Sequence, residues 1–233
     1  VVDLELDRVE VLTAGARLEL GTKNGAVDLP DPQVVVLSGI VAGDADSIAY
    51  IAISPYGTNG FIRQNGDLVS ISTGPYAQGK DLDAALRTVR MSDVIDPNAG
   101  PPSACGYEPG DVRLEPVGLP QVKVSHDSVI QRGPVTCRIA TVAVETDWEF
   151  TDRLFNGNSS AAAAYLVSLV GALSEIYERD FGVRLAIPFL RVWDSDVDPY
   201  SVANGDPPDQ VLNHWNSNMT DVERTITHYF TGR

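Results

Sequence analysis

Histidine and cysteine are the side chains that bind zinc best, so their spacing tests this sequence for a metal centre. The histidines are His126, His214 and His228, which lie 88 and 14 residues apart. A hydrolytic zinc centre on a helix needs two histidines one turn apart and a glutamate beside the first, in the pattern H-E-x-x-H. No histidine stands in that pattern here. We therefore expect all three to be surface or capping residues, and these 233 residues to hold no peptidase centre by themselves.

The two cysteines, Cys105 and Cys137, could form one disulfide bond or could be two thiols with separate roles. Two cysteines cannot make the disulfide framework of a small secreted domain. Cys137 opens a predicted core strand, where a cysteine most often behaves as a small apolar residue. The residues alone leave both interpretations open.

Alternating carboxylates in the sequence DSDVD, residues 194–198, resemble the start of a calcium-binding EF-hand loop. Pro199 stands where such a loop needs glycine, and Gly205 stands where it needs a bidentate glutamate. The sequence therefore predicts a solvated acidic loop. A calcium site of another kind, using Asp198 or Asp206, is the alternative.

Composition narrows the classes of partner. The net charge of −15 disfavours phosphate backbones and anionic lipid, so we expect no nucleic acid and no membrane surface as a partner. No apolar run approaches the roughly 18 to 20 residues that span a bilayer. The sequence also contains no Gly-rich phosphate loop, no G-x-S-x-G motif and no C-x-x-C motif. Because it begins at Val1 and is rich in Asp, Gly, Pro, Asn, Ser and Thr, we expect a processed, secreted protein.

Residues 1–75 are predicted to form a β-rich module. Residues 1–7 alternate apolar and acidic side chains, and residues 33–41 are a β-branched run bounded by prolines and a glycine. Residues 47–54, 60–63 and 67–72 continue as strands, and the turn at Asn65-Gly66 favours a hairpin because both central positions of a type I′ turn need positive φ. An antiparallel meander follows from this pattern.

Residues 76–135 have the composition of a linker, rich in Pro, Gly, Asp and Ser, with one short helical pattern at residues 81–91. Residues 136–233 are predicted to form an α/β unit. A β-branched strand over residues 138–146 precedes a long amphipathic helix capped at Asn158 or Ser159. We expect its apolar stripe, which includes Tyr165, Leu169 and Tyr177, to face the sheet.

The helix should end by Gly182, and residues 183–193 form a second, parallel strand whose Pro188 indicates an edge or a bulge. A further helix is predicted to start in residues 208–215. Glu145 and Asp147 are interpreted as structural residues that cap the loop after the first strand. The predicted fold class is therefore α+β.

The motifs AVETDWEF, FNGN, IYERDFGVRLAIPFLRVW and DPY, in this order, resemble the N-terminal half of a reprolysin-like catalytic domain of the metzincin type. The succession LSGIVAGDADSIAYIAIS and GFIRQNGDLVSIS resembles the prodomain of the same metallopeptidases, with an unrelated β-sandwich module as the alternative. The resemblance implies zinc in the complete enzyme, with ligands that are not in this chain. It also implies that Cys105, which precedes Gly106, acts as an inhibitory zinc ligand, as in a cysteine switch.

Three functions remain open from the sequence. The first is the prodomain and N-terminal half of a secreted zinc metallopeptidase, which acts on protein or peptide. Its partner would be the C-terminal remainder of the catalytic domain, as a separate chain or as residues outside the given sequence. The second is a non-catalytic structural or interaction subunit of an extracellular assembly. The third is a carbohydrate- or ligand-binding β-domain joined to an α/β domain.

Overall fold

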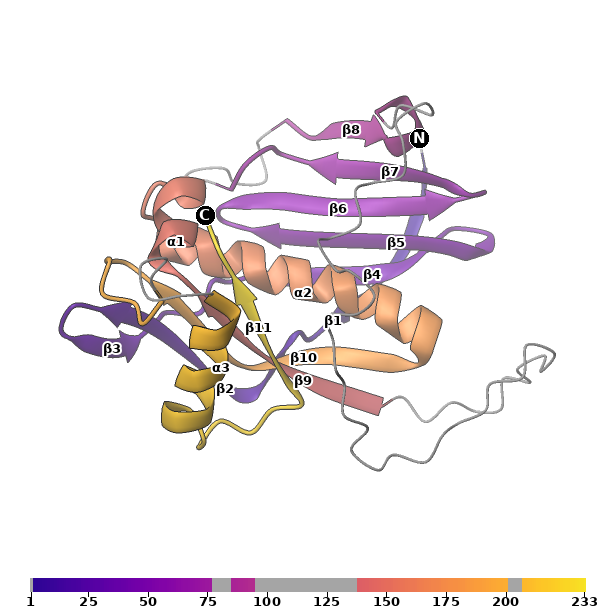
Figure 1. Ribbon diagram of the computed structural model, residues 1–233. Coiled ribbons are helices and arrows are strands. Elements are labelled where there is room, and N and C mark those ends of the chain that lie inside the picture. Colours follow the sequence, from indigo (N-terminus) through magenta and orange to yellow (C-terminus); the bar gives the residue numbers. More distant parts are fainter. Residues whose placement is uncertain (1, 77–84, 95–137, 201–206) are drawn as a thin grey trace, which may run out of the picture.

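Two β-sheets on opposite sides of one long helix form the described part of the protein (Figure 1). The computed structural model describes residues 2–76, 85–94, 138–200 and 207–233. The fold is α+β, as predicted: an antiparallel sheet followed by a mixed sheet with helices packed against its parallel strands. The division into residues 1–75, 76–135 and 136–233 stays a prediction.

The first sheet has six strands in the order β1-β4-β5-β6-β7-β8, and every neighbouring pair is antiparallel. Its bounds are β1 (Leu4–Val9), β4 (Val35–Val41), β5 (Asp44–Ser54), β6 (Gly57–Gln64), β7 (Asp67–Ser72) and β8 (Arg87–Arg90). Asn65 and Gly66 join β6 to β7 with φ values of 52° and 79°. The predicted meander and its Asn-Gly turn are therefore confirmed.

The helix predicted over residues 81–91 is wrong in its described part. Residues 87–90 form β8, which pairs with β7 from Arg87↔Ser72 to Arg90↔Val69, and Met91–Asp93 form a single 3-10 turn. The edge of β7 offers this short segment a ladder of backbone hydrogen bonds. Pairing of that kind outweighs a weak local helical preference.

The second sheet has the order β11-β9-β10-β2-β3 and joins strands from both ends of the chain. Its strands are β9 (Arg138–Thr146), β10 (Val183–Trp193), β11 (Ile226–Phe230), β2 (Leu12–Thr22) and β3 (Gly25–Asp28). The first four in spatial order are parallel, and β3 turns back antiparallel to β2. The position of β2 beside β10 was not predicted from the sequence.

Three helices flank this sheet: α1 (Trp148–Phe155), α2 (Ser159–Phe181) and α3 (Pro207–Asn218). The side chain of Asn158 accepts from the backbone N–H of Ala161, and Gly182 ends α2 at φ 65°, so both predicted helix ends are confirmed. The residues of α2 and α3 lie on opposite faces of the sheet, because they belong to two separate apolar clusters.

The long helix α2 buries more than the predicted stripe. Its buried residues include Ala161, Ala164 and Gly171, whereas Tyr177 is 43% exposed. Small side chains are needed because α2 packs against the second sheet on one side and β4 and β5 on the other. The 23-residue helix α2 contains an 18-residue window with a mean hydropathy of 1.4, so it is long and apolar enough to cross a membrane, and the expectation of no such run is wrong. The buried helix of a globular core meets the same criterion, and 56% of its apolar window is buried.

A bulge at Pro188 decides which side chains of β10 face α3. Leu185 and Ile187 lie in the α2-side cluster, but so do Leu190 and Val192, because β10 has one extra residue relative to β9 between Ala186 and Leu190. The prediction of a bulge is confirmed, but β10 is central rather than an edge strand. The extra residue moves Arg191 to the α3 face of the sheet.

Candidate functional site

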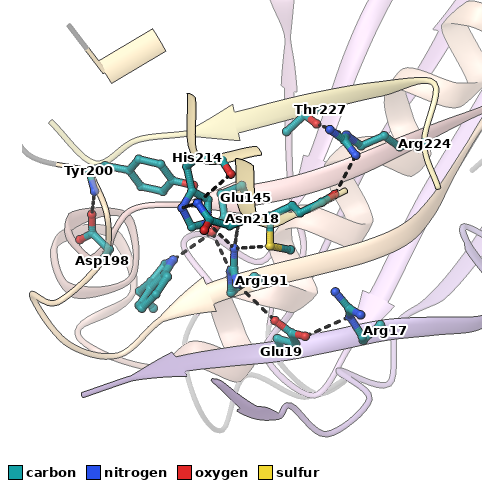
Figure 2. A network of polar contacts seen from close by, with 12 residues as sticks. Arg17, Glu19, Glu145, Arg191, Asp198, Tyr200, His214, Asn218, Arg224 and Thr227 are labelled. Atoms are coloured by element: carbon teal, nitrogen blue, oxygen red, sulfur yellow. Dashed lines mark hydrogen bonds and ion pairs between the residues drawn. The ribbon is translucent and has the colours of Figure 1, made fainter. Parts of the chain in front are cut away.

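The candidate site lies where parallel strands β9, β10 and β11 end, the edge at which open α/β sheets commonly bind ligands. The strand registers place Glu145 between Arg191 of β10 and Tyr229 of β11. Arg191 is also level with Glu19 of β2. One row of polar side chains therefore crosses four strands. Figure 2 shows three of its members, Glu19, Arg191 and Glu145, with His214 beside Arg191.

A buried ion pair is the centre of this row. Glu145 has no exposed surface and Arg191 is 7% exposed. The Nε of Arg191 donates to Oε1 of Glu145 at 3.0 Å, its Nη2 donates to Oε2 at 2.8 Å, and the indole N–H of Trp193 donates to Oε1 at 2.9 Å. These hydrogen bonds satisfy both carboxylate oxygens, which is the condition for keeping a charge pair out of water.

Burial raises the pKa of Glu145 above its usual value, although the hydrogen bonds and charge of Arg191 act in the opposite direction. Burial also lowers the pKa of Arg191, but the hydrogen bonds and charge of Glu145 outweigh that effect and its pKa lies above the usual value. A guanidinium does not deprotonate in proteins, and it would be costly to bury without a counter-charge. The pair is therefore ionised.

His214 on α3 is a neutral partner of Arg191. The Nη2 of Arg191 lies 3.3 Å from Nε2 of His214. A guanidinium can only donate, so Nε2 is the unprotonated nitrogen of this ring. Burial, and then the charge of Arg191, lower the pKa of His214. His214 was predicted to be a surface or capping residue, whereas it is half-buried in this network.

The charge row continues into the N-terminal strand β2. Glu19 accepts from Nη1 of Arg191 at 3.4 Å and pairs with Nε of Arg17 at 3.0 Å. Arg17 in turn pairs with Asp221 at 2.8 Å and lies over the ring of Phe189, 4.9 Å from its centroid. Residues from the N-terminal and the C-terminal parts of the sequence therefore share one network.

A second buried carboxylate, Asp147, joins α1 to the end of β11. Its Oδ1 accepts from the backbone N–H groups of Phe150 at 2.7 Å and Gly232 at 3.1 Å. Its Oδ2 accepts from the hydroxyls of Tyr229 at 3.1 Å and Thr231 at 2.6 Å. The capping role predicted for Asp147 is confirmed, and it includes the N-terminus of α1, a helix that was not predicted from the sequence. Glu145, for which the same role was predicted, instead pairs with Arg191.

Asp198 belongs to the acidic loop for which a calcium site was the alternative prediction. Its Oδ1 accepts from the backbone N–H of Tyr200 at 2.8 Å, and its Oδ2 accepts from that of Trp148 at 3.1 Å. Burial raises the pKa of Asp198 against the effect of these two hydrogen bonds. In the structure Asp198 holds the loop after β10 against the start of α1, and calcium binding stays a prediction. Asp206 lies outside the described residues.

Metal ligands do not converge in the part of the chain that the structure describes. No group of three His, Cys, Asp or Glu side chains there could hold a metal ion. His214 faces the cation Arg191, and His228 packs its ring 4.4 Å from that of Phe230. His126, Cys105 and Cys137 lie outside the described residues, so the zinc-ligand and disulfide predictions remain predictions.

The sequence contained one signal for the missed network. Residues 17–20, RLEL, alternate polar and apolar side chains, and Asn24-Gly25, a hairpin turn signal, follows after three further residues. These features predict β2 and β3 as a hairpin. They do not identify β10 as the strand beside it, because that pairing joins segments more than 160 residues apart.

Comparison with known proteins finds a match in the part of the chain that contains Glu145, Arg191 and His214. Residues 136–232 match the family model described as metallo-peptidase family M12B, reprolysin-like. None of the curated proteins compared with the chain matches it. Residues 136–232 therefore form a reprolysin-like M12B family domain, called the family domain below. The match does not extend to the strands before it, so their assignment as a prodomain stays a prediction.

Proposed function

We propose that the family domain is the N-terminal half of the catalytic domain of a secreted zinc metallopeptidase, and that the preceding β-rich residues are its prodomain. The family match over residues 136–232 carries this proposal. The parallel strands β9 and β10 joined by α2 agree with the β-strand, helix, β-strand order that the motifs implied. Protein or peptide is the proposed substrate.

Zinc would have to be held by residues outside the described ones. The family implies zinc in its active members, but the described histidines do not fit it: one lies against a cation and the other packs on an aromatic ring. We therefore place the zinc ligands in a C-terminal remainder of the catalytic domain. That remainder would be a separate chain or residues that follow the given sequence.

The described residues would serve that remainder as a scaffold. Asp147 fixes the backbone at Gly232, and Arg233 donates from Nη2 to the carbonyl oxygen of Tyr200 at 2.6 Å. Arg233 also pairs with Glu149 at 3.0 Å. These contacts hold the residues after β11 against α1, so they set the direction in which the backbone leaves the sheet.

Isolation of the natural protein tests the proposal. Intact mass spectrometry and metal analysis should find a polypeptide segment with the H-E-x-x-H pattern and about one zinc per molecule, the stoichiometry of a catalytic site. The 233-residue chain by itself should bind no stoichiometric zinc and cleave no peptide. A natural product that consists of this chain alone, without zinc and without activity, would contradict the proposal and support the non-catalytic interaction subunit instead.

A further inference from the structure

We infer that the N-terminal part of the chain, residues 2–76 and 85–94, is a permanent structural component of the family domain and stays bound to it when the backbone between them is cut. This inference goes beyond the proposed function and does not depend on zinc or on peptidase activity. Three sets of contacts carry it.

The first contact is a shared sheet. Strand β2 lies parallel to β10 from Phe189↔Arg17 to Trp193↔Gly21. At the ends of this pairing, the N–H of Ile187 donates to the carbonyl oxygen of Val11 at 2.8 Å, and that of Asp194 donates to Gly21 at 3.1 Å. Without β2, strand β10 would become an edge of the sheet, although almost none of its side chains is exposed. Parallel sheets are stable mainly when they are buried, so this edge needs its partner.

The second contact is the fit between β2 and the buried ion pair. Gly21 lies under the ring of Trp193, and a Cβ at Gly21 would come 2.3 Å from that ring. Trp193 in turn holds Glu145 by its indole N–H. Removal of β2 would therefore uncover Trp193 and take Glu19 away from Arg191, whose charge would then meet water with one counter-charge fewer.

The third contact is between the first sheet and α2. The hydroxyl of Tyr50 on β5 donates to the carbonyl oxygen of Ser168 at 2.5 Å, and the hydroxyl of Tyr76 lies 2.8 Å from Oγ of Ser168. Gly171 makes this approach possible, because a Cβ there would come 2.5 Å from the Tyr50 hydroxyl oxygen.

Around these hydrogen bonds, one continuous apolar cluster extends through both sheets and the helix. Its buried members include Val36 and Ala52 from the first sheet, Leu166 and Val170 from α2, and Val144 and Leu190 from the second sheet. The family domain therefore does not close its core by itself. Separation would expose one side of α2 as well as the β10 edge, at a cost in hydrophobic free energy that grows with the area uncovered.

A split version of the whole protein tests the inference. Residues 1–110 and 111–233 are coexpressed as two polypeptides that together keep every residue, with an affinity tag on the first. We expect both to copurify at a one-to-one ratio in about 1 M NaCl, because the apolar cluster does not depend on surface ion pairs that salt screens. Recovery of residues 111–233 alone as a folded monomer would overturn the inference.

Hydrogen exchange in the uncut chain provides the second measurement. Gly171→Val should reduce amide protection in β4 and β5 and, by a similar factor, in β9 and β10, because both sheets share the core around α2. Tyr177→Val, at an exposed position of the same helix, is the matched control and should leave protection unchanged. The milder Tyr50→Phe, which removes only the hydroxyl, should act in the same direction as Gly171→Val.

Loss of protection confined to the first sheet, with β9 and β10 unchanged, would show two independent units and would contradict the inference. Neither measurement uses a metal or an activity. A failure here is therefore distinguishable from a failure of the proposed peptidase function.

Discussion

Arg191 is buried, and Glu145 is its nearest counter-charge. Glu145→Gln would leave the guanidinium buried without its main counter-charge. Removing one partner of a buried ion pair typically costs about 3–5 kcal/mol, so we expect a loss of that order in the free energy of unfolding, measured by urea denaturation. The matched control is Glu10→Gln, which removes an exposed partner of Arg8 and should cost less than about 1 kcal/mol. Equal losses in the two variants would show that Arg191 does not need Glu145.

His214 adds a pH dependence of known sign. Burial and the charge of Arg191 lower its pKa in the folded protein, so the unfolded chain binds the proton more readily. Stability from this residue is then present above the ordinary histidine pKa and is lost as pH falls below it. Urea unfolding of wild type and His214→Gln should be compared from about pH 7 to about pH 5, the range in which histidine titrates.

We expect the variant to lose less stability than wild type over that range. The comparison isolates His214 from Asp198 and Glu175, whose pKa values are raised by burial and whose protonation acts in the opposite direction. His228 has a pKa lowered by burial and is present in both proteins, so its effect cancels. Parallel pH profiles for the two proteins would exclude His214 as a source of acid sensitivity.

At the scale of elements, Asp147 connects helix α1 to strand β11. Asp147→Ala removes the N-cap of α1, which by itself costs about 1–2 kcal/mol, and frees Gly232 and Thr231. We expect a larger effect on hydrogen exchange in β11 and residues 231–233 than in β9. The control is Asp152→Ala, at an exposed position of the same helix. Unchanged protection after β11 in Asp147→Ala would show that Arg233 alone anchors this end.

Short sequence patterns predicted the elements that depend mainly on the backbone preferences of neighbouring residues. The Asn65-Gly66 hairpin, the capped helix α2 and the bulge at Pro188 follow from backbone preferences of the residues involved. The position of β2 does not, because its alternating pattern fits any sheet with a free edge. The residues that select β10 are Gly21, which leaves room for the ring of Trp193, and Glu19, which pairs with Arg191.

The candidate site was predictable to the same limited degree. Capping by Asp147 follows from an aspartate placed directly after a strand, and the structure confirms it. The ion pair of Glu145 with Arg191 depends on the one-residue shift at Pro188, which moves Arg191 to the face of its partner. A bulge can be expected from a proline in a strand, but the face of each later residue cannot be assigned without the register.

At the scale of the whole molecule, a permanently bound N-terminal part restricts how a peptidase of this kind could be kept latent. If β2 remains in the sheet, activation cannot require that the entire N-terminal part leave. Control would then fall to a smaller group that can leave the metal on its own. Cys105 is the predicted candidate, since a thiolate can occupy the zinc position that a catalytic water needs.

Cys105→Ser therefore tests latency at this scale, in the full-length protein with its zinc site. We expect the unprocessed variant to cleave a peptide substrate several-fold faster than the unprocessed parent, because serine is a poor zinc ligand at neutral pH and water can take the vacated position. Cys137→Ser is the matched control and should leave activity unchanged. Peptide mapping with and without reduction separates the alternatives: a Cys105–Cys137 disulfide, or equal latency in Cys105→Ser and the parent, would rule out the thiolate. Size-exclusion chromatography of the activated variant then shows whether the N-terminal part stays bound. If it does, activation requires only that Cys105 leave the zinc and does not require that the N-terminal strands leave the family domain.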